Sequence, residues 1–238
     1  MKYIFTKQLV RGLIKSRPNR FIMLVDIQEK LERCHCPSTG RIGNIEFKDI
    51  SCWLSESTDS SGKRKTRYTV EAISPNGKTW IGINQTKANS YIAFFLKNNL
   101  LKNMVDARNF KREVKLKDSR IDFLINDNCF LEVKTPLTML PFGNKKPRTE
   151  FNSFERLERH FTDISKQIAK GQRAIVLLCY LYNAARFKVP KQSNNHIVKT
   201  VEKANARGLE HWQVNLRVDK NGVSLINYFK LDIFNGKS

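Results

Sequence analysis

Six short β patterns occupy the first eighty or so residues, and no helical periodicity interrupts them. The β-rich runs lie at 8–14, 21–27, 31–36, 50–55, 67–73 and 78–83. Turn-forming stretches separate them, including Asn76-Gly77, and an Asn-Gly pair between β-rich runs favours a hairpin. Many short strands without helices favour a small closed sheet, so residues 1–84 are predicted to form a barrel of the OB or a similar type.

The pattern changes after Asn84, and a second domain is predicted over residues 85–238. Apolar residues at helical spacing begin near position 92, behind Asn89 or Ser90 as the expected N-cap. Three strand patterns follow at 111–116, 120–125 and 130–134, then a helix at 153–171, a buried strand at 174–182, a helix at 197–208 and a hairpin at Asn221-Gly222. This alternation predicts an α/β half, and an α+β chain overall.

The charge of the chain narrows the range of partners. Of 238 residues, 43 are Lys or Arg and 22 are Asp or Glu, which gives a net charge of +21. Such a charge favours a polyanionic partner, with DNA or RNA first and an acidic membrane surface second. The longest apolar run, 174–182, is too short to span a bilayer, and five scattered cysteines favour a reducing compartment. We therefore expect a cytoplasmic protein without a membrane segment or a small-molecule cofactor; the oligomeric state stays open, a dimer included.

The most informative segment is a predicted hairpin over residues 119–134. If its loop is Asn126-Asp127-Asn128, with Asn128 in the left-handed conformation, residue 125 pairs with 129. Asp122 then stands directly opposite Glu132, and Arg120 opposite Lys134. Like charges that face each other destabilise a ladder, and a divalent cation between the carboxylates would compensate. Lys134 would then orient or help deprotonate an attacking water and stabilise charge on a phosphate.

The alternative is that the four charged groups neutralise one another on a solvated sheet face. The hairpin alone does not decide between the two interpretations. Similarly, Cys34-His35-Cys36 has no partner pair for zinc, so buried strand thiols are expected there. Trp53, Tyr68 and Trp80 could stack bases, but at most one or two of them are expected to be exposed.

Asp122 followed by Glu132-Val133-Lys134 resembles the PD-(D/E)XK nuclease motif, with Ile121 in the position of its Pro. The wider frame resembles the sugar fermentation stimulation protein A (SfsA) family over nearly the whole chain. Its further matches include Cys36-Pro37, Thr39-Gly40-Arg41, Trp53-Leu54-Ser55, Trp80-Ile81-Gly82-Ile83-Asn84, Asn89, Arg112-Glu113-Val114-Lys115, Gly171 and Arg173-Ala174. The chain departs from that family at Ser38, Ile42, Leu157, Asn183 and the longer 141–154 segment.

The resemblance implies an N-terminal OB-like barrel and a C-terminal PD-(D/E)XK nuclease-like domain with a mixed central sheet. It implies Asp122 and Glu132 as ligands of Mg²⁺ or Mn²⁺, and Lys134 as the catalytic lysine. Glu113 is the implied third ligand and catalytic acid; its alternative is a surface partner of nearby lysines and arginines, among them Lys111 and Lys115. The residues predicted to contact nucleic acid are Arg11, Arg41, Lys115, Arg120, Arg156, Arg159 and His160.

These features predict a nucleic-acid-binding protein that hydrolyses phosphodiesters in DNA or RNA with a divalent metal. The rival prediction is a non-catalytic regulatory DNA-binding protein in which the acids are inert. A third interpretation is a basic protein that docks on ribosomes or acidic membranes. Metal-dependent cleavage of labelled single strands, duplex and RNA separates the first interpretation from the other two.

Overall fold

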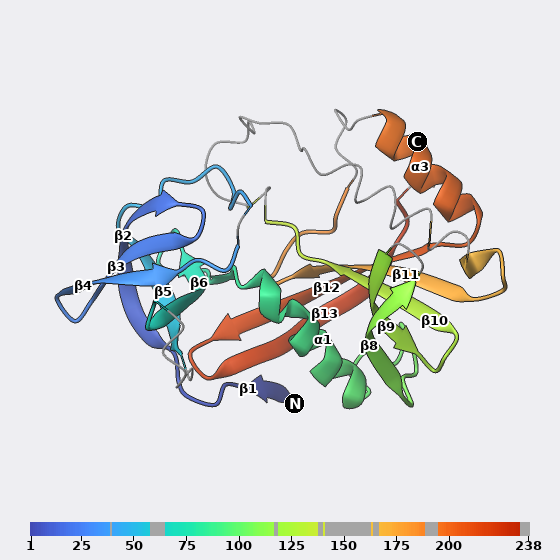
Figure 1. Cartoon of the computed structure of the whole chain (residues 1–238), viewed down its shortest axis with the longest axis horizontal. Helices are drawn as coiled ribbons and strands as arrows, with labels where there is room; N and C mark the ends of the chain where they lie inside the picture. Colours follow the sequence, from blue (N-terminus) through green and yellow to red (C-terminus); the bar gives the residue numbers. More distant parts are fainter. Residues whose placement is uncertain are drawn as a thin grey trace.

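The chain forms a barrel at one end of the molecule and a larger twisted sheet with helices at the other (Figure 1). The computed structural model describes residues 1–38, 40–57, 65–116, 119–137, 140, 163, 167–188 and 195–233. The strands of the smaller sheet are β2 (Val10–Asn19), β3 (Ile22–Ile27), β4 (Lys30–His35), β5 (Ile50–Glu56), β6 (Tyr68–Ser74) and β7 (Ile81–Gly82).

The smaller sheet closes into a five-stranded barrel. Its hydrogen-bonded order is β4-β3-β2-β5-β6-β7. A parallel pairing of β4 with β6 closes the five strands β2 to β6 into the barrel, and the short β7 pairs with the other edge of β6. Antiparallel neighbours with a single parallel closure between the third and fifth barrel strands are the topology of an OB fold. Met23, Val25, Cys52, Leu54 and Val70 fill the barrel interior. The prediction of an OB-like barrel is therefore confirmed.

The larger sheet has seven strands in the order β1-β13-β12-β11-β10-β9-β8. Their bounds are β1 (Lys2–Ile4), β8 (Phe110–Leu116), β9 (Ser119–Ile125), β10 (Cys129–Lys134), β11 (Arg173–Tyr180), β12 (Glu210–Asp219) and β13 (Gly222–Leu231). β10, β11 and β12 run parallel, and the other neighbours are antiparallel. The sheet is mixed, as expected.

Helices cover both faces of the larger sheet. The 3₁₀ turn η1 (Gln85–Lys87) continues into α1 (Ala88–Lys97), whose Tyr91 and Phe95 join one core with sheet residues such as Phe123. On the opposite face, Ala204 of α3 (Asn195–Ala206) packs in a second core with Ile121. β11 is buried along most of its length because it lies between these two cores.

The barrel and the larger sheet are firmly joined. Tyr180 and Tyr182, at the end of β11, belong to the barrel core. Gly82 of β7 donates its backbone N–H to the carbonyl of Leu181 at 2.8 Å, and a Cβ at Gly82 would lie 2.5 Å from Leu181 Cβ. Only glycine permits so close an approach, so this residue type is part of the joint.

Two predictions about organisation need correction. The predicted first domain, 1–84, does not account for β1, which pairs with β13 and belongs to the larger sheet. Local periodicity carries no information on a pairing between residues more than two hundred positions apart. The helix expected to begin behind Asn89 or Ser90 instead begins at Ala88, after η1, and its N-cap Lys87 makes no side-chain cap hydrogen bond. The helix predicted at 153–171 lies almost entirely outside the described residues.

Candidate metal and catalytic site

The β9–β10 hairpin has the predicted register at its closed end. Ile125 pairs with Cys129 and Phe123 with Leu131, so the loop consists of three residues. The left-handed residues of the loop are Asn126 and Asp127, with φ of 50° and 57°, not Asn128 as predicted. The loop length was therefore readable from the sequence, although the conformation of its individual residues was not.

The ladder is interrupted on both sides of Asp122. Pairing between β9 and β10 ends at Phe123 and Leu131, so the predicted direct pairing of 122 with 132 is not formed. On the other side, the β8–β9 register skips Glu113, which stands at the position opposite Asp122 with a left-handed φ of 54°. The chain therefore departs from regular β geometry at the acidic residue itself.

Hydrogen bonds hold the Asp122 carboxylate at this break. Its Oδ2 accepts the backbone N–H of Val133 at 2.7 Å, and its Oδ1 accepts the side-chain amide of Asn89 at 2.6 Å. The carboxylate thus satisfies a donor of β10 where the strand ladder has stopped. Each oxygen keeps a lone pair for a further partner.

Glu132 and Lys134 complete the cluster from β10. Glu132 is 4% exposed, and its Oε1 accepts a hydrogen bond from Lys134 Nζ at 2.6 Å. Burial and the nearby negative charge of Glu132 raise the pKa of Asp122 to about 6, although Val133, Asn89 and Lys134 act in the opposite direction. Two carboxylates therefore converge in a region where negative charge is poorly compensated.

The raised pKa of Asp122 argues against the interpretation in which the four charged groups merely neutralise one another. Mutual neutralisation would lower the pKa of Asp122, whereas the pKa is raised. Arg120 does not face Lys134 as predicted; it pairs across the ladder with Lys115 and lies 3.9 Å from Glu113. Lys134 is thus the cation of this cluster, and Arg120 belongs to the outer strand pair.

Glu113 is placed apart from Asp122 and Glu132. Its side chain is half exposed and forms its long ion pair with Arg120. Within the part of the chain that the structure describes, no three His, Cys, Asp or Glu side chains are grouped so as to hold a metal ion. The structure brings together Asp122, Glu132 and Lys134, and Glu113 stays a prediction as a ligand.

Family models match both halves of the chain. The model of the SfsA N-terminal OB domain matches residues 16–83, and that of the sugar fermentation stimulation protein RE domain matches residues 86–222. The chain belongs to the sugar fermentation stimulation protein (SfsA) family. A homologue from Methanobrevibacter smithii is 28% identical over 231 residues, 91% of this chain and 94% of that protein. One from Shewanella denitrificans is 30% identical over 182 residues, 73% and 75%.

A solved SfsA structure confirms the fold. The protein from Pyrococcus furiosus, described as a complex with Ca²⁺, superposes with a TM-score of 0.77 over 98% of this chain and 99% of that one. The sequence identity is 22%, so this likeness concerns the arrangement of the backbone.

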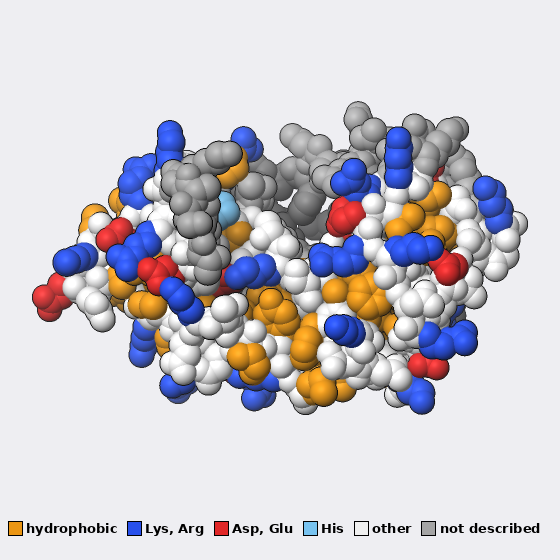
Figure 2. All heavy atoms as spheres, turned by 60° about the horizontal axis from the view of Figure 1, so that its bottom comes forward, with side chains coloured by type: hydrophobic (Ala, Val, Ile, Leu, Met, Phe, Trp, Pro, Cys, Tyr) orange, Lys and Arg blue, Asp and Glu red, His pale blue; other side chains and the backbone are white. Residues whose placement is uncertain are grey.

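The described basic residues predicted to contact nucleic acid lie on both halves of this SfsA chain. Arg11 is on β2 and Lys115 on β8, both exposed, while the guanidinium of Arg41 is held by Gly43 and Asn44. Lys and Arg side chains are spread over the face shown in Figure 2. The remaining predicted contacts, Arg156, Arg159 and His160, lie outside the described residues. None of the helices in the described part of the chain is long and apolar enough to cross a membrane.

The other sequence candidates are mostly packing residues. Cys34 and Cys36 are buried thiols, and burial raises the pKa of both. Tyr68 is buried, whereas Trp53 and Trp80 stack on each other at 4.9 Å and pack against the larger core. These aromatic rings therefore support the joint between barrel and sheet.

Asn89 is the site residue whose role the sequence did not reveal. Its position at the start of a helix pattern indicated an N-cap, yet its amide is directed to Asp122. Its residue type was the available signal, because the side-chain amide of an asparagine can donate a hydrogen bond to a carboxylate.

Proposed function

We propose that this protein is a divalent-metal-dependent nuclease that hydrolyses phosphodiester bonds in DNA or RNA. The observation that carries the proposal is the convergence of Asp122, Glu132 and Lys134 at the break between β9 and β10. Partial burial and the negative charge of a second carboxylate raise the pKa of Asp122 to about 6, and a bound cation would relieve this arrangement.

The residues present fit a hard cation. Mg²⁺ is typically held by one or two carboxylates and completes its coordination with water and phosphate oxygens. Asp122 and Glu132 would supply these two carboxylates. When bound, the ion would supply Lewis-acid polarisation of a phosphate and of a nearby water. The Ca²⁺ in the description of the Pyrococcus furiosus protein supports a divalent ion at a site of this family.

The side chains of this protein have distinct roles in the proposed reaction. Asn89 and the N–H of Val133 fix the direction of the Asp122 carboxylate, which would otherwise rotate. Lys134, held 2.6 Å from Glu132 and about one third exposed, presents its remaining N–H donors toward solvent, where a phosphate oxygen or a water would be bound. It stabilises the negative charge that develops on the phosphate in the transition state.

Nucleic acid as the substrate is supported by the net charge of +21 and by the OB barrel. Neutralising phosphates with Lys and Arg releases condensed counterions, so binding is expected to weaken steeply with salt and to show little sequence preference.

The test is cleavage of end-labelled single-stranded DNA, duplex DNA and RNA by the purified protein in Mg²⁺, Mn²⁺ or chelator. Wild type should cleave at least one substrate only with metal. Asp122→Ala and Lys134→Ala should lower cleavage by at least about a thousandfold and leave binding within about threefold. The matched control is Lys111→Ala, which removes an exposed cation of β8 that pairs with Asp127 in the loop between β9 and β10.

Two results would contradict the proposal. Metal-dependent cleavage that persists in both site variants would indicate a contaminating nuclease or another active centre. Tight binding with no cleavage of any substrate would instead support the non-catalytic regulatory protein, in which the two acids have no chemical role.

A further inference from the structure

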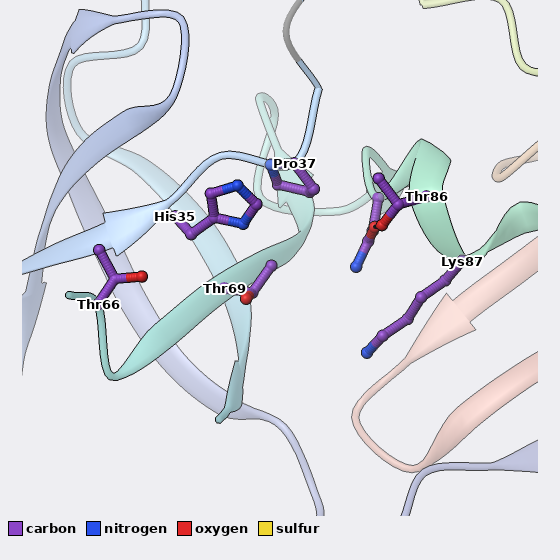
Figure 3. Close-up of a pocket in the computed structure, with 7 residues that line it drawn as sticks. His35, Pro37, Thr66, Thr69, Thr86 and Lys87 are labelled. Atoms are coloured by element: carbon purple, nitrogen blue, oxygen red, sulfur yellow. Dashed lines mark hydrogen bonds between the residues drawn. The ribbon is translucent and has the colours of Figure 1, made fainter. Parts of the chain in front are cut away.

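A pocket of about 340 Å³ with a mixed polar and apolar lining opens between the barrel and the segment that leads into α1 (Figure 3). β4 and the residues after it supply His35 and Pro37, and β6 with its preceding turn supplies Thr69 and Thr66. The pocket therefore lies over the parallel seam of the barrel, where His35 is paired with Thr69.

The opposite wall comes from the start of the second half of the chain. Asn84, Thr86 and Lys87 line it, and Lys87 extends toward the barrel in Figure 3. The wall is fixed from behind by Glu71 of β6, which is 2% exposed. The Glu71 carboxylate accepts hydrogen bonds from Lys87 Nζ at 2.6 Å, Asn84 Nδ2 at 2.8 Å and Ser55 Oγ at 2.5 Å.

We propose that this pocket binds one nucleotide of a single strand that leads to the catalytic residues. The inference rests on the proposed function and names its substrate class: a nucleic acid with at least one unpaired nucleotide beside the scissile bond. A base within a duplex is stacked and paired, so it would enter a pocket of this kind only after being turned out of the helix.

The size and lining suit a nucleotide. A volume of about 340 Å³ is at the small end of ligand pockets, which run from roughly 300 to 1,000 Å³. The imidazole of His35 gives a flat ring on which a base can stack, in the way that single-stranded nucleic acids are commonly recognised, and Pro37 adds an apolar surface. The side chain of Asn84 is held by Glu71 and Thr86, so its position in the lining is fixed.

Lys87 is the pocket cation. An ammonium group has three N–H donors, and the side chain is 38% exposed although Glu71 accepts one bond. A phosphate at the mouth can therefore be reached without breaking the pair with Glu71. The Glu71 carboxylate offsets much of the positive charge of Lys87, so the pocket is not expected to bind small anions unselectively.

The pocket is connected to the catalytic residues by short contacts. Gln85 of η1 donates its side-chain amide to the carbonyl of Thr135 at 2.5 Å, and Thr135 directly follows Lys134. Asn89, which holds Asp122, is only two residues beyond Lys87, so their Cα atoms are at most about 7.6 Å apart. A strand seated in the pocket would therefore be placed within a few nucleotides of the site.

The first experiment measures the binding of fluorescent single strands of twelve nucleotides and duplexes of twelve base pairs. Chelator is present, so that metal-dependent cleavage does not occur. His35→Ala and Thr86→Val should each weaken single-strand binding by about tenfold and duplex binding by less than twofold. His35→Phe keeps a flat ring and should restore most of the affinity. Arg33→Ala, an exposed cation on the same strand outside the pocket lining, is the control and should weaken both substrates equally.

The second experiment locates the nucleotide. The chain has four histidines, so the imidazole NMR signal of His35 is assigned by its loss in His35→Phe. Adenosine monophosphate and a single strand should both shift this signal, whereas inorganic phosphate at the same concentration should not. An equal shift with phosphate would overturn the proposal in favour of an anion site. Tighter binding of the free nucleotide than of the strand would overturn the strand assignment.

The two proposals fail in different ways. If the pocket variants bind single strands like wild type, the nucleotide site is refuted, whether or not the protein cleaves. If wild type never cleaves but the pocket variants lose single-strand binding, the nuclease is refuted and the pocket stands. If both hold, the pocket variants should raise KM for single strands by about tenfold and leave kcat within about twofold.

Discussion

Two carboxylates of this molecule, Glu71 and Asp122, have opposite surroundings. Glu71 lies in the barrel and receives hydrogen bonds from Ser55, Asn84 and Lys87. Asp122 lies in the larger sheet, where Asn89 and Val133 donate to it but burial and the negative charge of Glu132 still raise its pKa to about 6. The surrounding donors compensate the negative charge of Glu71, whereas the negative charge of Asp122 is only partly compensated.

Under the proposed function, this difference separates a structural acid, Glu71, from a metal-binding acid, Asp122. Burying a charge is costly unless partners compensate it, so a protein that needs an acid only for stability surrounds it with donors. An acid that must bind an ion is left with part of its compensation missing, which the ion then supplies. This contrast predicts opposite consequences when each acid is neutralised.

The largest expected effect concerns the two glutamates near Asp122. Glu132→Gln should lower metal-dependent cleavage by at least about a thousandfold, because it removes one of the two carboxylates proposed to hold the metal. Glu113→Gln should lower it by less than about threefold, since Glu113 is exposed and pairs with Arg120. Single-turnover cleavage measures both. A loss of similar size in the Glu113 variant would establish a third ligand and extend the site to β8.

Neutralising the barrel acid should cost stability. Glu71→Gln replaces an ion pair and charge-assisted hydrogen bonds by neutral ones, and the free energy of unfolding should fall by about 2 to 3 kcal/mol. Urea unfolding in chelator measures it. The control is Glu56→Gln, whose carboxylate pairs with Lys7 and Arg67 at the surface, and its effect should be much smaller. Equal losses would show that burial of Glu71 contributes nothing specific.

Neutralising Asp122 should instead raise the free energy of unfolding of the metal-free protein at neutral and higher pH. The folded protein retains a proton on Asp122 up to about pH 6, whereas the unfolded chain releases it near 3.8. The stability that this group contributes is therefore present below about pH 4 and is lost as the pH rises through 6. Asp122→Asn should stabilise the metal-free protein by about 1 to 2 kcal/mol at pH 8, part of a shift worth roughly 3 kcal/mol.

The same variant should give no gain at about pH 3, where both states of the wild type are largely protonated at this position. Urea unfolding at the two pH values is the measurement. A gain of equal size at both would assign the effect to packing. Mg²⁺ should stabilise the wild type at pH 8 and lose this effect below about pH 6, because a protonated Asp122 cannot serve as a ligand.

The smallest effect concerns the residue that orients Asp122. The amide of Asn89 lowers the pKa of Asp122, so Asn89→Ala should raise it further and move the acidic limb of the pH–rate profile to higher pH by about half a unit. Ser90→Ala, the next residue of α1, should leave the limb in place. A lower rate with an unmoved limb would indicate a purely structural role for Asn89.

The barrel and the sheet differed in how far local patterns predicted them. Alternation and turn residues placed most strands, and Asn76-Gly77 lies between paired strands as expected. The hairpin expected around Asn221-Gly222 is present, but its turn is Lys220-Asn221, because Gly222 already pairs with Asp219. The pairing of β1 with β13 was missed, because alternation specifies a strand but not its partner. The start of α1 was misplaced because Asn89 is a good cap residue that is engaged by a distant strand.

The candidate site was predicted in its residues more than in its geometry. Counting from the three-residue loop brought Asp122 near Glu132, and the register supports that count as far as Phe123 and Leu131. Beyond this pair the strands separate, and the carboxylate takes a backbone donor that a regular ladder would have used. Such a break depends on Glu113 and Asn89, which come from other elements, so no pattern within the hairpin announces it.

The double attachment of the barrel has a mechanical consequence. The chain leaves the larger sheet after β1, forms the barrel and returns through β7 and η1, while Leu9 and Gly82 fasten the two connections to Lys220 and Leu181. Because both connections are fastened, the barrel has no single hinge about which to rotate. In the proposed nuclease, a strand bound to the barrel would therefore be cut at a uniform distance from the position at which it is bound.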